Sequence, residues 1–546
     1  LTAIANDDPP PLPRTLDEPL RTTISRCLRK NPGDRFSNGR ELYRSLSGNE
    51  QTSSRPVHFA AAAGVILLMS VVIFLMTESR SADREPVAEE SEDFVLSPRN
   101  ETLVVMLPVD SGIPAPPPFI ASAIQEEILR GLSNDPTLRV LPPASTAVLT
   151  SSANSEELLK GLGVDTILRL TVSGESPSLS VDLQVEMVGG ARHSVAVRAE
   201  DLQSMTPLVL GELQRLLGLA VSTTPSPGST VPEAMRLYYE ARHFWSKRGE
   251  TGVRRSIELF RKAIDLDPGF ALAYAGLADA YAVLHNASAL PTSETFPRAR
   301  AAALKALEID PDLPEAQISL AYVDHYYDRD WDEAERRYRR AIELQPDNAT
   351  AHQWYSELLA VTGREEEARR EIDRALELDP LSPIISATAI WIELVTRNYD
   401  RGLERGRAAI AVNPGEARSL AYMARIRTEL GDYDEAVSMH RQAAASGNRI
   451  LELWLAEALA RSGQKTEARD LVEKIEDEPG YVNPYYLAFP YIALGQHDRA
   501  LALLEKAVDT NVEQLAWLAV DPSLDPLRRH ERFKSLIRRI TRGADT

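Results

Sequence analysis

"AIELQPDNATAHQWYSELLA", residues 341–360, is the stretch that decides the fold. Four other stretches of the chain share its pattern: an alanine-led apolar run closed by a proline, then a second helical run. The shared prolines are Pro268, Pro311, Pro346, Pro380 and Pro414. Their successive separations are 43, 35, 34 and 34 residues. A nearly fixed period of this length predicts a chain built from structural repeats.

Within one period, small residues fall where two helices must cross. Gly363 ends the first helical run, and Ala368 and Ala375 lie five and twelve positions later in the second run, which Pro380 ends. The copy that starts at Gly431 keeps the same offsets. A 34-residue period with these features resembles the tetratricopeptide repeat. The resemblance implies a mainly α fold, an α-solenoid of stacked helix pairs.

We expect eight helix pairs over residues 233–511, because two later copies lose the proline but keep the glycine-to-alanine offset of five. The one 43-residue spacing predicts an insertion at residues 285–297. Residues 512–546 form a tail in which apolar residues at helical spacing predict a capping helix. The apolar residues are Leu527, Phe533, Leu536, Ile537 and Ile540.

Residues 101–219 predict a small α/β domain. "TLVVMLPV" (102–109) is a short β-branched strand, and the helix after it has apolar residues at every fourth position. "SLSVDLQVEMVGG" and "RHSVAVRAE" alternate apolar and polar residues and pair as a hairpin around Gly189 and Gly190. The order of elements, with strings such as "LGVDTILRLTV", resembles the amino-terminal domain of TolB-type translocation proteins. Two linkers flank the domain, at residues 78–100 and 221–232.

"PVHFAAAAGVILLMSVVIFLMT", residues 56–77, contains no Asp, Glu, Lys or Arg. About 20 apolar residues cross the hydrocarbon core of a bilayer, so the segment predicts a single transmembrane helix; a buried helix of a soluble domain is the alternative. Basic residues flank both ends, so their distribution favours a cytoplasmic amino terminus only weakly. Ala60 and Gly64, small residues four positions apart, would allow two spans to pair in a homodimer.

The first 48 residues contain "RCLRKNPGDRF" (26–36), a basic run between two helical patterns. It resembles the end of the large lobe of bacterial Ser/Thr protein kinases. The resemblance implies a structural role for Arg35, whose glutamate partner in that family is absent from this chain. The Gly-rich loop, the strand lysine and the H-R-D and D-F-G motifs are absent too, so phosphoryl transfer by this chain is not expected. The resemblance implies a Ser/Thr kinase as the full-length parent, and because the sequence opens on Leu1 rather than Met we expect further sequence upstream. The enzyme assignment of this chain is therefore uncertain.

Composition limits the chemistry. The formal net charge of −19 disfavours nucleic acid as a partner. The one cysteine excludes an internal disulfide or a multi-cysteine metal site, and the nine histidines form no ligand motif. We therefore expect no cofactor, no metal and no catalytic residues.

Two functions remain open. The chain is the sensor portion of a receptor-like Ser/Thr kinase, with its amino terminus in the cytoplasm and its repeats across a bacterial inner membrane, or it is a membrane-anchored scaffold unrelated to a kinase. In both, the concave groove of the repeats binds a protein or peptide partner. By the register of the repeat family, the groove residues are Gln353, Glu357, Trp391 and Arg425. Trp391 is either an exposed anchor for the partner or a packed core residue.

Overall fold

The computed structural model describes residues 102–541, apart from 112–116, 134, 136, 147, 152–154, 176–177, 220–227, 247–249 and 288–291. These residues belong to one compact unit that starts at Pro98. The kinase-like run with Arg35, the apolar segment 56–77 and the linker 78–100 lie outside the described residues. Among the residues that are described, no helix is both long enough and apolar enough to span a bilayer.

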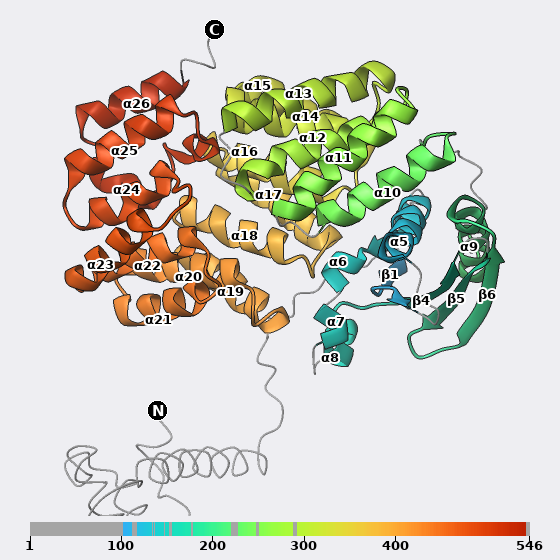
Figure 1. The fold of residues 1–546 in the computed structure, drawn as a ribbon. Coiled ribbons are helices and arrows are strands. Elements are labelled where there is room, and N and C mark those ends of the chain that lie inside the picture. The colour runs from blue at the N-terminus through green and yellow to red at the C-terminus, as the bar shows by residue number, and fades with distance from the viewer. Residues whose placement is uncertain are drawn as a thin grey trace, which may run out of the picture. The chain divides into compact units, whose positions relative to one another are not determined.

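The chain first forms a mixed β-sheet (Figure 1). Its strands are β1 (Thr102–Met106), β3 (Leu138–Leu141), β4 (Thr166–Glu175), β5 (Ser178–Met187) and β6 (Arg192–Ala199). They lie in the order β3-β1-β4-β5-β6, and the short β2 (Asp110–Ser111) pairs with β4. The first three strands are parallel and the last three are antiparallel. The expected hairpin is confirmed: β5 and β6 join at Gly189, whose φ of 75° suits a residue without a side chain.

Helices lie on both faces of this sheet. On one face, α5 (Pro118–Ser133) and α9 (Leu202–Leu217) pack their apolar residues against Val104 and Leu168. On the other face, the short helices α6 (Pro143–Thr146), α7 (Val148–Ser151) and α8 (Ser155–Gly161) lie near Leu103 and Val105. Successive side chains of a β-strand point to opposite faces of the sheet, so neighbouring residues of β1 belong to different hydrophobic cores.

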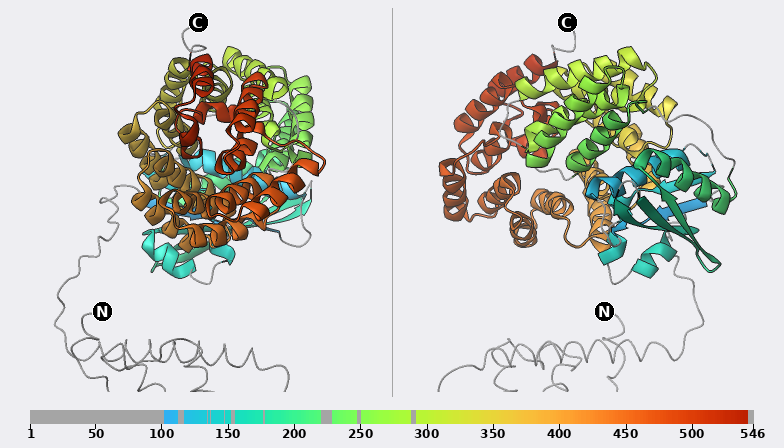
Figure 2. Two further views of the ribbon diagram at one scale, coloured as in Figure 1. Left: turned by 90° about the vertical axis from the view of Figure 1, so that its left-hand side faces the viewer. Right: turned by 45° about the vertical axis from the view of Figure 1, so that its right-hand side comes forward.

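Sixteen helices follow in eight antiparallel pairs, which form a curved array (Figures 1 and 2). The first helices of the pairs are α10 (Pro232–Ser246), α12 (Ala271–Ala287), α14 (Pro314–Val323), α16 (Ala349–Val361), α18 (Pro383–Val395), α20 (Ala417–Leu430), α22 (Arg449–Arg461) and α24 (Pro484–Ala493). The second helices are α11 (Glu250–Leu266), α13 (Thr292–Ile309), α15 (Trp331–Leu344), α17 (Glu365–Leu378), α19 (Tyr399–Val412), α21 (Tyr433–Ala444), α23 (Lys465–Asp477) and α25 (His497–Asp509). The mainly α solenoid expected from the period is confirmed.

The small residues of the repeat pattern do what their spacing predicted. Ala368 and Ala375 on α17 are fully buried, so neighbouring backbones approach closely there. Gly363 turns the chain between α16 and α17 with a φ of 79°, a conformation that favours glycine. The side chain of Asn348 accepts a hydrogen bond from the backbone N–H of Ala351 and caps the start of α16.

The first and second helices differ in how they are buried. Second helices such as α17 have one apolar side and one charged side. In α18, by contrast, almost every residue from Ile385 to Val395 is buried, including Glu393. A helix that is buried all round must be covered on the side that faces away from its repeat neighbours.

The end of the chain supplies that cover. After α25, two short 3₁₀ helices, η3 (Glu513–Trp517) and η4 (Pro522–Leu527), precede the last helix, α26 (Glu531–Thr541). The expected capping helix is confirmed, because α26 packs against α25 through Phe533 and Leu536. Leu527 was wrongly assigned to that helix. It lies in η4 and is fully buried in the core that the repeats form with the end of the chain.

Candidate protein-interaction surface

The four residues expected in the groove lie on consecutive first helices. Gln353 and Glu357 are on α16, Trp391 is on α18 and Arg425 is on α20. The first helices of the array thus present them on what we call the inner face. Gln353, Trp391 and Arg425 are only 5%, 3% and 5% exposed. The side chains that were expected to meet a partner are therefore covered.

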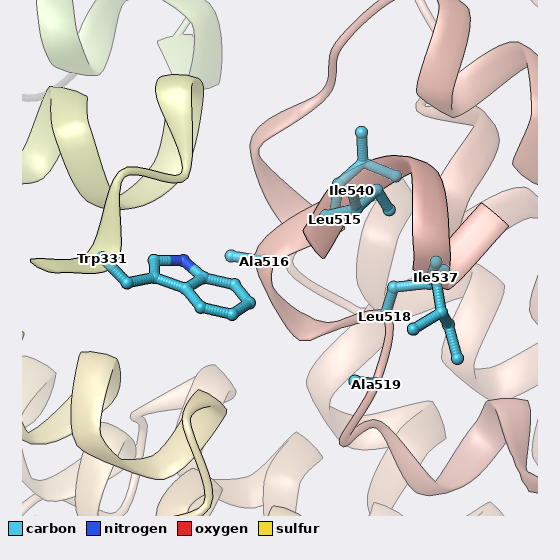
Figure 3. Close-up of a pocket in the computed structure, with 7 residues that line it drawn as sticks. All are labelled: Trp331, Leu515, Ala516, Leu518, Ala519, Ile537 and Ile540. Carbon is cyan, nitrogen blue, oxygen red and sulfur yellow. The ribbon is translucent and has the colours of Figure 1, made fainter. Parts of the chain in front are cut away.

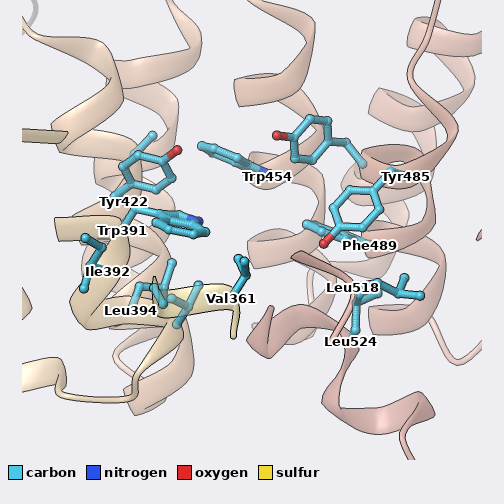
Figure 4. Close-up of a cluster of buried hydrophobic side chains, with 14 of the residues drawn as sticks. Val361, Trp391, Ile392, Leu394, Tyr422, Trp454, Tyr485, Phe489, Leu518 and Leu524 are labelled. Carbon is cyan, nitrogen blue, oxygen red and sulfur yellow. The ribbon is translucent and has the colours of Figure 1, made fainter. Parts of the chain in front are cut away.

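Residues 511–528, which we call the inward segment, cover the inner face. The ring of Trp517, in η3, packs against that of Trp391 with 5.2 Å between ring centroids and 49° between the ring planes, and it meets Tyr326 edge-on at 6.3 Å. Leu518 and Leu524 belong to the same buried cluster as Trp391 (Figure 4). Of the two alternatives for Trp391, the structure shows the packed one.

Arg425 of α20 is bound by the central residues of the inward segment. Its guanidinium donates to Asp521 Oδ1 at 2.5 Å and to Ser523 Oγ at 3.0 Å. It also lies over the rings of Trp454 (5.0 Å) and Phe489 (5.5 Å), where the π-electrons attract a cation. Asp521 is fully buried, so this ion pair is screened from water on both sides.

A second acid lies close to this ion pair. Burial on α22 raises the pKa of Glu457 to about 7, against the opposing effect of the nearby Arg425 cation. Glu457 is 5% exposed, so its carboxyl group carries a proton over part of the physiological pH range.

Gln353 and Glu357 form a polar group with Thr388 and Tyr326. Gln353 donates to Thr388 Oγ1 at 3.0 Å and to Glu357 Oε1 at 3.2 Å. The hydroxyl of Tyr326 also donates to Glu357. Burial raises the pKa of Glu357, and the hydrogen bond from Tyr326 opposes that rise. These hydrogen bonds therefore link three helix pairs through side chains that the sequence had predicted to contact a partner.

The two ends of the inward segment are fixed by polar contacts at the rim of the inner face. At its start, Arg329 donates to Asn511 Oδ1 at 2.5 Å, and Thr292 Oγ1 donates to the backbone carbonyl of Asn511 at 2.6 Å. Towards its end, Arg397 donates to Asp525 Oδ1 and to the Val520 carbonyl, both at 2.8 Å. The segment therefore connects the second, third and fifth helix pairs to the eighth.

The α/β domain touches the array at two other places. Near the first pair, Glu126 of α5 accepts from Tyr238 of α10 at 2.9 Å and lies 3.4 Å from Arg242. In the loop after α17, Asp379 accepts from Ser145 of α6 at 2.6 Å. Burial raises the pKa of Asp379 to about 6, although the Ser145 hydrogen bond opposes the rise.

A small apolar pocket lies between the inward segment, Trp331 and α26 (Figure 3). Its lining residues are Trp331, Leu515, Ala516, Leu518, Ala519, Ile537 and Ile540. Its cavity volume is about 10 Å³, room for about one water molecule and far below the ~300 Å³ at which ligand pockets start. Among the described residues, no group of three or more His, Cys, Asp or Glu side chains could hold a metal ion. A protein surface is a better candidate site than a small-molecule pocket.

Sequence reasoning missed the inward segment. "LAWLAVDPSLDPL", residues 515–527, carries apolar residues at irregular spacing and two Asp-Pro steps, neither of which fits the repeat pattern. A long apolar stretch without helical periodicity, directly after the last repeat, was the available signal.

Comparison with known proteins supports the repeats. A family model for the tetratricopeptide repeat matches residues 323–383 and 423–481. Among solved structures, pilF of Pseudomonas aeruginosa is 21% identical, with 38% of this chain and 90% of that chain covered and a TM-score of 0.31. Yeast Tom70 is 16% identical, with 78% and 83% covered and a TM-score of 0.39.

A curated relative is the transcriptional regulator HilA of Salmonella typhimurium, 21% identical over 174 residues, which are 32% of this chain and 31% of that protein. The chain therefore spans about a third of the length of the curated relatives it matches. Together with the helix pairs, the family-model match shows that this chain carries tetratricopeptide repeats.

Proposed function

We propose that this chain is the protein-interaction and sensing portion of a membrane-anchored, receptor-like Ser/Thr kinase, whose repeats bind a protein partner on the inner face. One observation carries the binding part: the inner face already holds a segment that is not part of the repeats. This inward segment is held by contact between the rings of Trp391 and Trp517 and by a buried Arg425–Asp521 pair. Large aromatic and arginine side chains are the residue types that dominate binding energy at protein interfaces.

The anchoring and kinase parts rest on sequence. Segment 56–77 is the proposed single span, with a cytoplasmic amino terminus and extracytoplasmic repeats, and residues 1–48 with Arg35 are the proposed kinase remnant. Residues 101–219 are the proposed TolB-like module. A scaffold that shares the span and the repeats but has no kinase relation is the alternative. Finding H-R-D and D-F-G in frame upstream of Leu1 would favour the kinase, and an upstream sequence that lacks both would favour the scaffold.

Topology has a direct test. A reporter that works only in the cytoplasm, fused after Thr546 in the full chain, is expected to stay inactive. The same reporter at the amino terminus is the matched control and is expected to be active. An active reporter after Thr546 would contradict extracytoplasmic repeats.

Partner binding is tested by site-specific cross-linking in the full chain. A photo-reactive residue at Gln353, on the inner face, is expected to capture a protein, whereas one at Glu366, on the exposed side of α17, is expected to capture none. Capture from Glu366 alone would place the interaction on the outer surface. Capture from neither position would count against the array as a binding module.

A further inference from the structure

The inward segment has the features of a bound peptide. It is not part of the repeat pattern. It contacts the first helices of four pairs, on the side where this repeat architecture leaves a groove. The contacts are made with Tyr322 of α14, Trp391 of α18, Arg425 of α20 and Tyr485 of α24. Its secondary structure is limited to η3 and η4, short 3₁₀ turns, and it pairs with no strand. Its position therefore depends on side-chain contacts with the inner face.

Those contacts form a regular series along the segment. The ring of Trp517 packs against that of Trp391. Four residues later Asp521 pairs with Arg425, and four residues after that Asp525 pairs with Arg397 at 2.8 Å. An aromatic side chain and two carboxylates at equal spacing thus meet one aromatic and two cationic positions of the repeats. This is complementarity of charge and shape between the face and the segment.

The fit is incomplete in two ways that would favour exchange. The indole N–H groups of Trp391 and Trp454 are buried, and within the part of the chain that the structure describes neither has a hydrogen-bond acceptor. The Arg397–Asp525 pair is also accessible to water, with side chains 36% and 44% exposed, so this end is the weaker one. A competing peptide could therefore enter at Asp525 and advance towards Trp391.

We propose that residues 511–528 are a displaceable internal ligand of the inner face, and that the partner which replaces them is an extended acidic peptide with an aromatic residue four positions before an aspartate. This inference rests on the proposed function, and it adds the chemistry of the partner. Because the internal ligand is tethered, its effective concentration is in the millimolar range, so a free peptide binds the intact chain weakly.

The test uses a labelled synthetic peptide, "NVEQLAWLAVDPSLDPLR", which is the inward segment itself, and fluorescence anisotropy with the full chain. In the test variant, Trp517→Ala and Asp525→Ala weaken the internal copy and leave the inner face and Asp521 intact. We expect this variant to bind the peptide at least ten times more tightly than the unaltered chain does. A peptide that carries the same two substitutions is expected not to bind.

The matched control removes the same two residue types elsewhere. Trp245→Ala with Asp498→Ala changes the first and the last helix pairs and leaves the inward segment untouched. This control is expected to bind the peptide no better than the unaltered chain. Equal binding by the control and the test variant, or no binding by a test variant that keeps its helical circular dichroism, would overturn the proposal.

Hydrogen–deuterium exchange of the unaltered chain covers the case in which the test variant fails to fold. Amides of residues 515–527 are expected to exchange at least tenfold faster than those of α18 and α22, because the segment opens while the repeats stay folded. If residues 515–527, α18 and α22 all exchange at the same rate, the inward segment is a permanent part of the core, and the proposal that it is a displaceable ligand is overturned. The proposed function would then still be tested independently, by the cross-linking at Gln353 and Glu366.

Discussion

The repeat array is covered by its own chain in two places, and the two contacts differ in kind. The α/β domain meets the array through polar groups, Glu126 with Tyr238 and Ser145 with Asp379, and through a few apolar residues such as Leu381. The inward segment meets it mainly through apolar groups, with Leu515, Leu518, Leu524 and Leu527 all at most 1% exposed. Both contacts join residues far apart in sequence, but the second contributes many more apolar side chains to the core of the repeats.

This difference indicates how each contact should respond to the loss of a side chain. Polar contacts contribute little net free energy, because water competes for the same groups. Burial of apolar surface contributes roughly 25 cal/mol per Å² and depends little on salt. Loss of a side chain should therefore cost more at the inward segment than at the α/β contact.

The largest effect is expected at the contact between Trp391 and Trp517. Trp391→Ala should lower the free energy of unfolding by about 3–5 kcal/mol, because it empties a packed site beside Trp517. Urea denaturation followed by circular dichroism measures the change. Trp354→Ala, which removes a partly buried tryptophan from α16, is the control and should cost less. An unchanged unfolding midpoint for Trp391→Ala would show that the contact between Trp391 and Trp517 does not stabilise the array.

The two acids of the inward segment should differ sharply. Asp521→Ala leaves Arg425 buried without its carboxylate and should cost about 3 kcal/mol or more. Asp525→Ala removes an exposed partner of Arg397 and should cost about 1 kcal/mol or less. Thermal unfolding of the two variants side by side gives the comparison, and similar losses would mean that the Arg425 pair is not the central contact.

Titration of Glu457 should make the inward contact sensitive to pH. Its pKa in the folded chain is about 7, above the ordinary value of 4.5, so the protonated form is favoured by folding. The stabilisation is therefore complete below pH 4.5 and is lost as the pH rises through about 7.

The melting temperature should accordingly fall between pH 5 and pH 8, and Glu457→Gln, which keeps a neutral group there, should reduce that fall. Asp379, with a pKa of about 6, should add a smaller change of the same sign. A melting temperature that rises over this range in the unaltered chain, or an equal fall in Glu457→Gln, would contradict the assignment.

The smallest effect is expected at the polar contact of the α/β domain. Ser145→Ala removes one hydrogen bond to the buried Asp379 and should cost about 1–2 kcal/mol. Chemical denaturation at pH 5 and pH 8 measures it. Since Asp379 without Ser145 should titrate at a still higher pH, the loss is expected to be larger at pH 8, and a loss as large as that of Trp391→Ala would remove the contrast between the two contacts.

Much of the fold could be predicted from the sequence, because its signals are local. The period of the prolines, the turn at Gly363 and the alanines at helix crossings predicted the helix pairs, and alternation in β5 and β6 predicted the hairpin. Each signal lies within one repeat or one hairpin, so steric fit between near neighbours is enough to determine it.

The candidate site could be predicted only in part. The repeat register predicted Gln353, Glu357, Trp391 and Arg425 as groove residues. In the structure all four lie on first helices of the repeats, and all but Glu357 are at most 5% exposed. Their burial could not be deduced, since the residues that cover them are far away in sequence: Trp517 for Trp391, and Asp521, 96 positions from Arg425.

By itself, then, the sequence determined that this protein is a tetratricopeptide-repeat array preceded by a small α/β domain. Only the tertiary structure decided that the inner face of the array is filled by residues 511–528 and that Leu527 belongs to that filling. The physical reason is that helix pairs follow from contacts at fixed short spacing, whereas the path of an irregular segment depends on which apolar surface and which buried charge remain to be covered once the repeats have stacked.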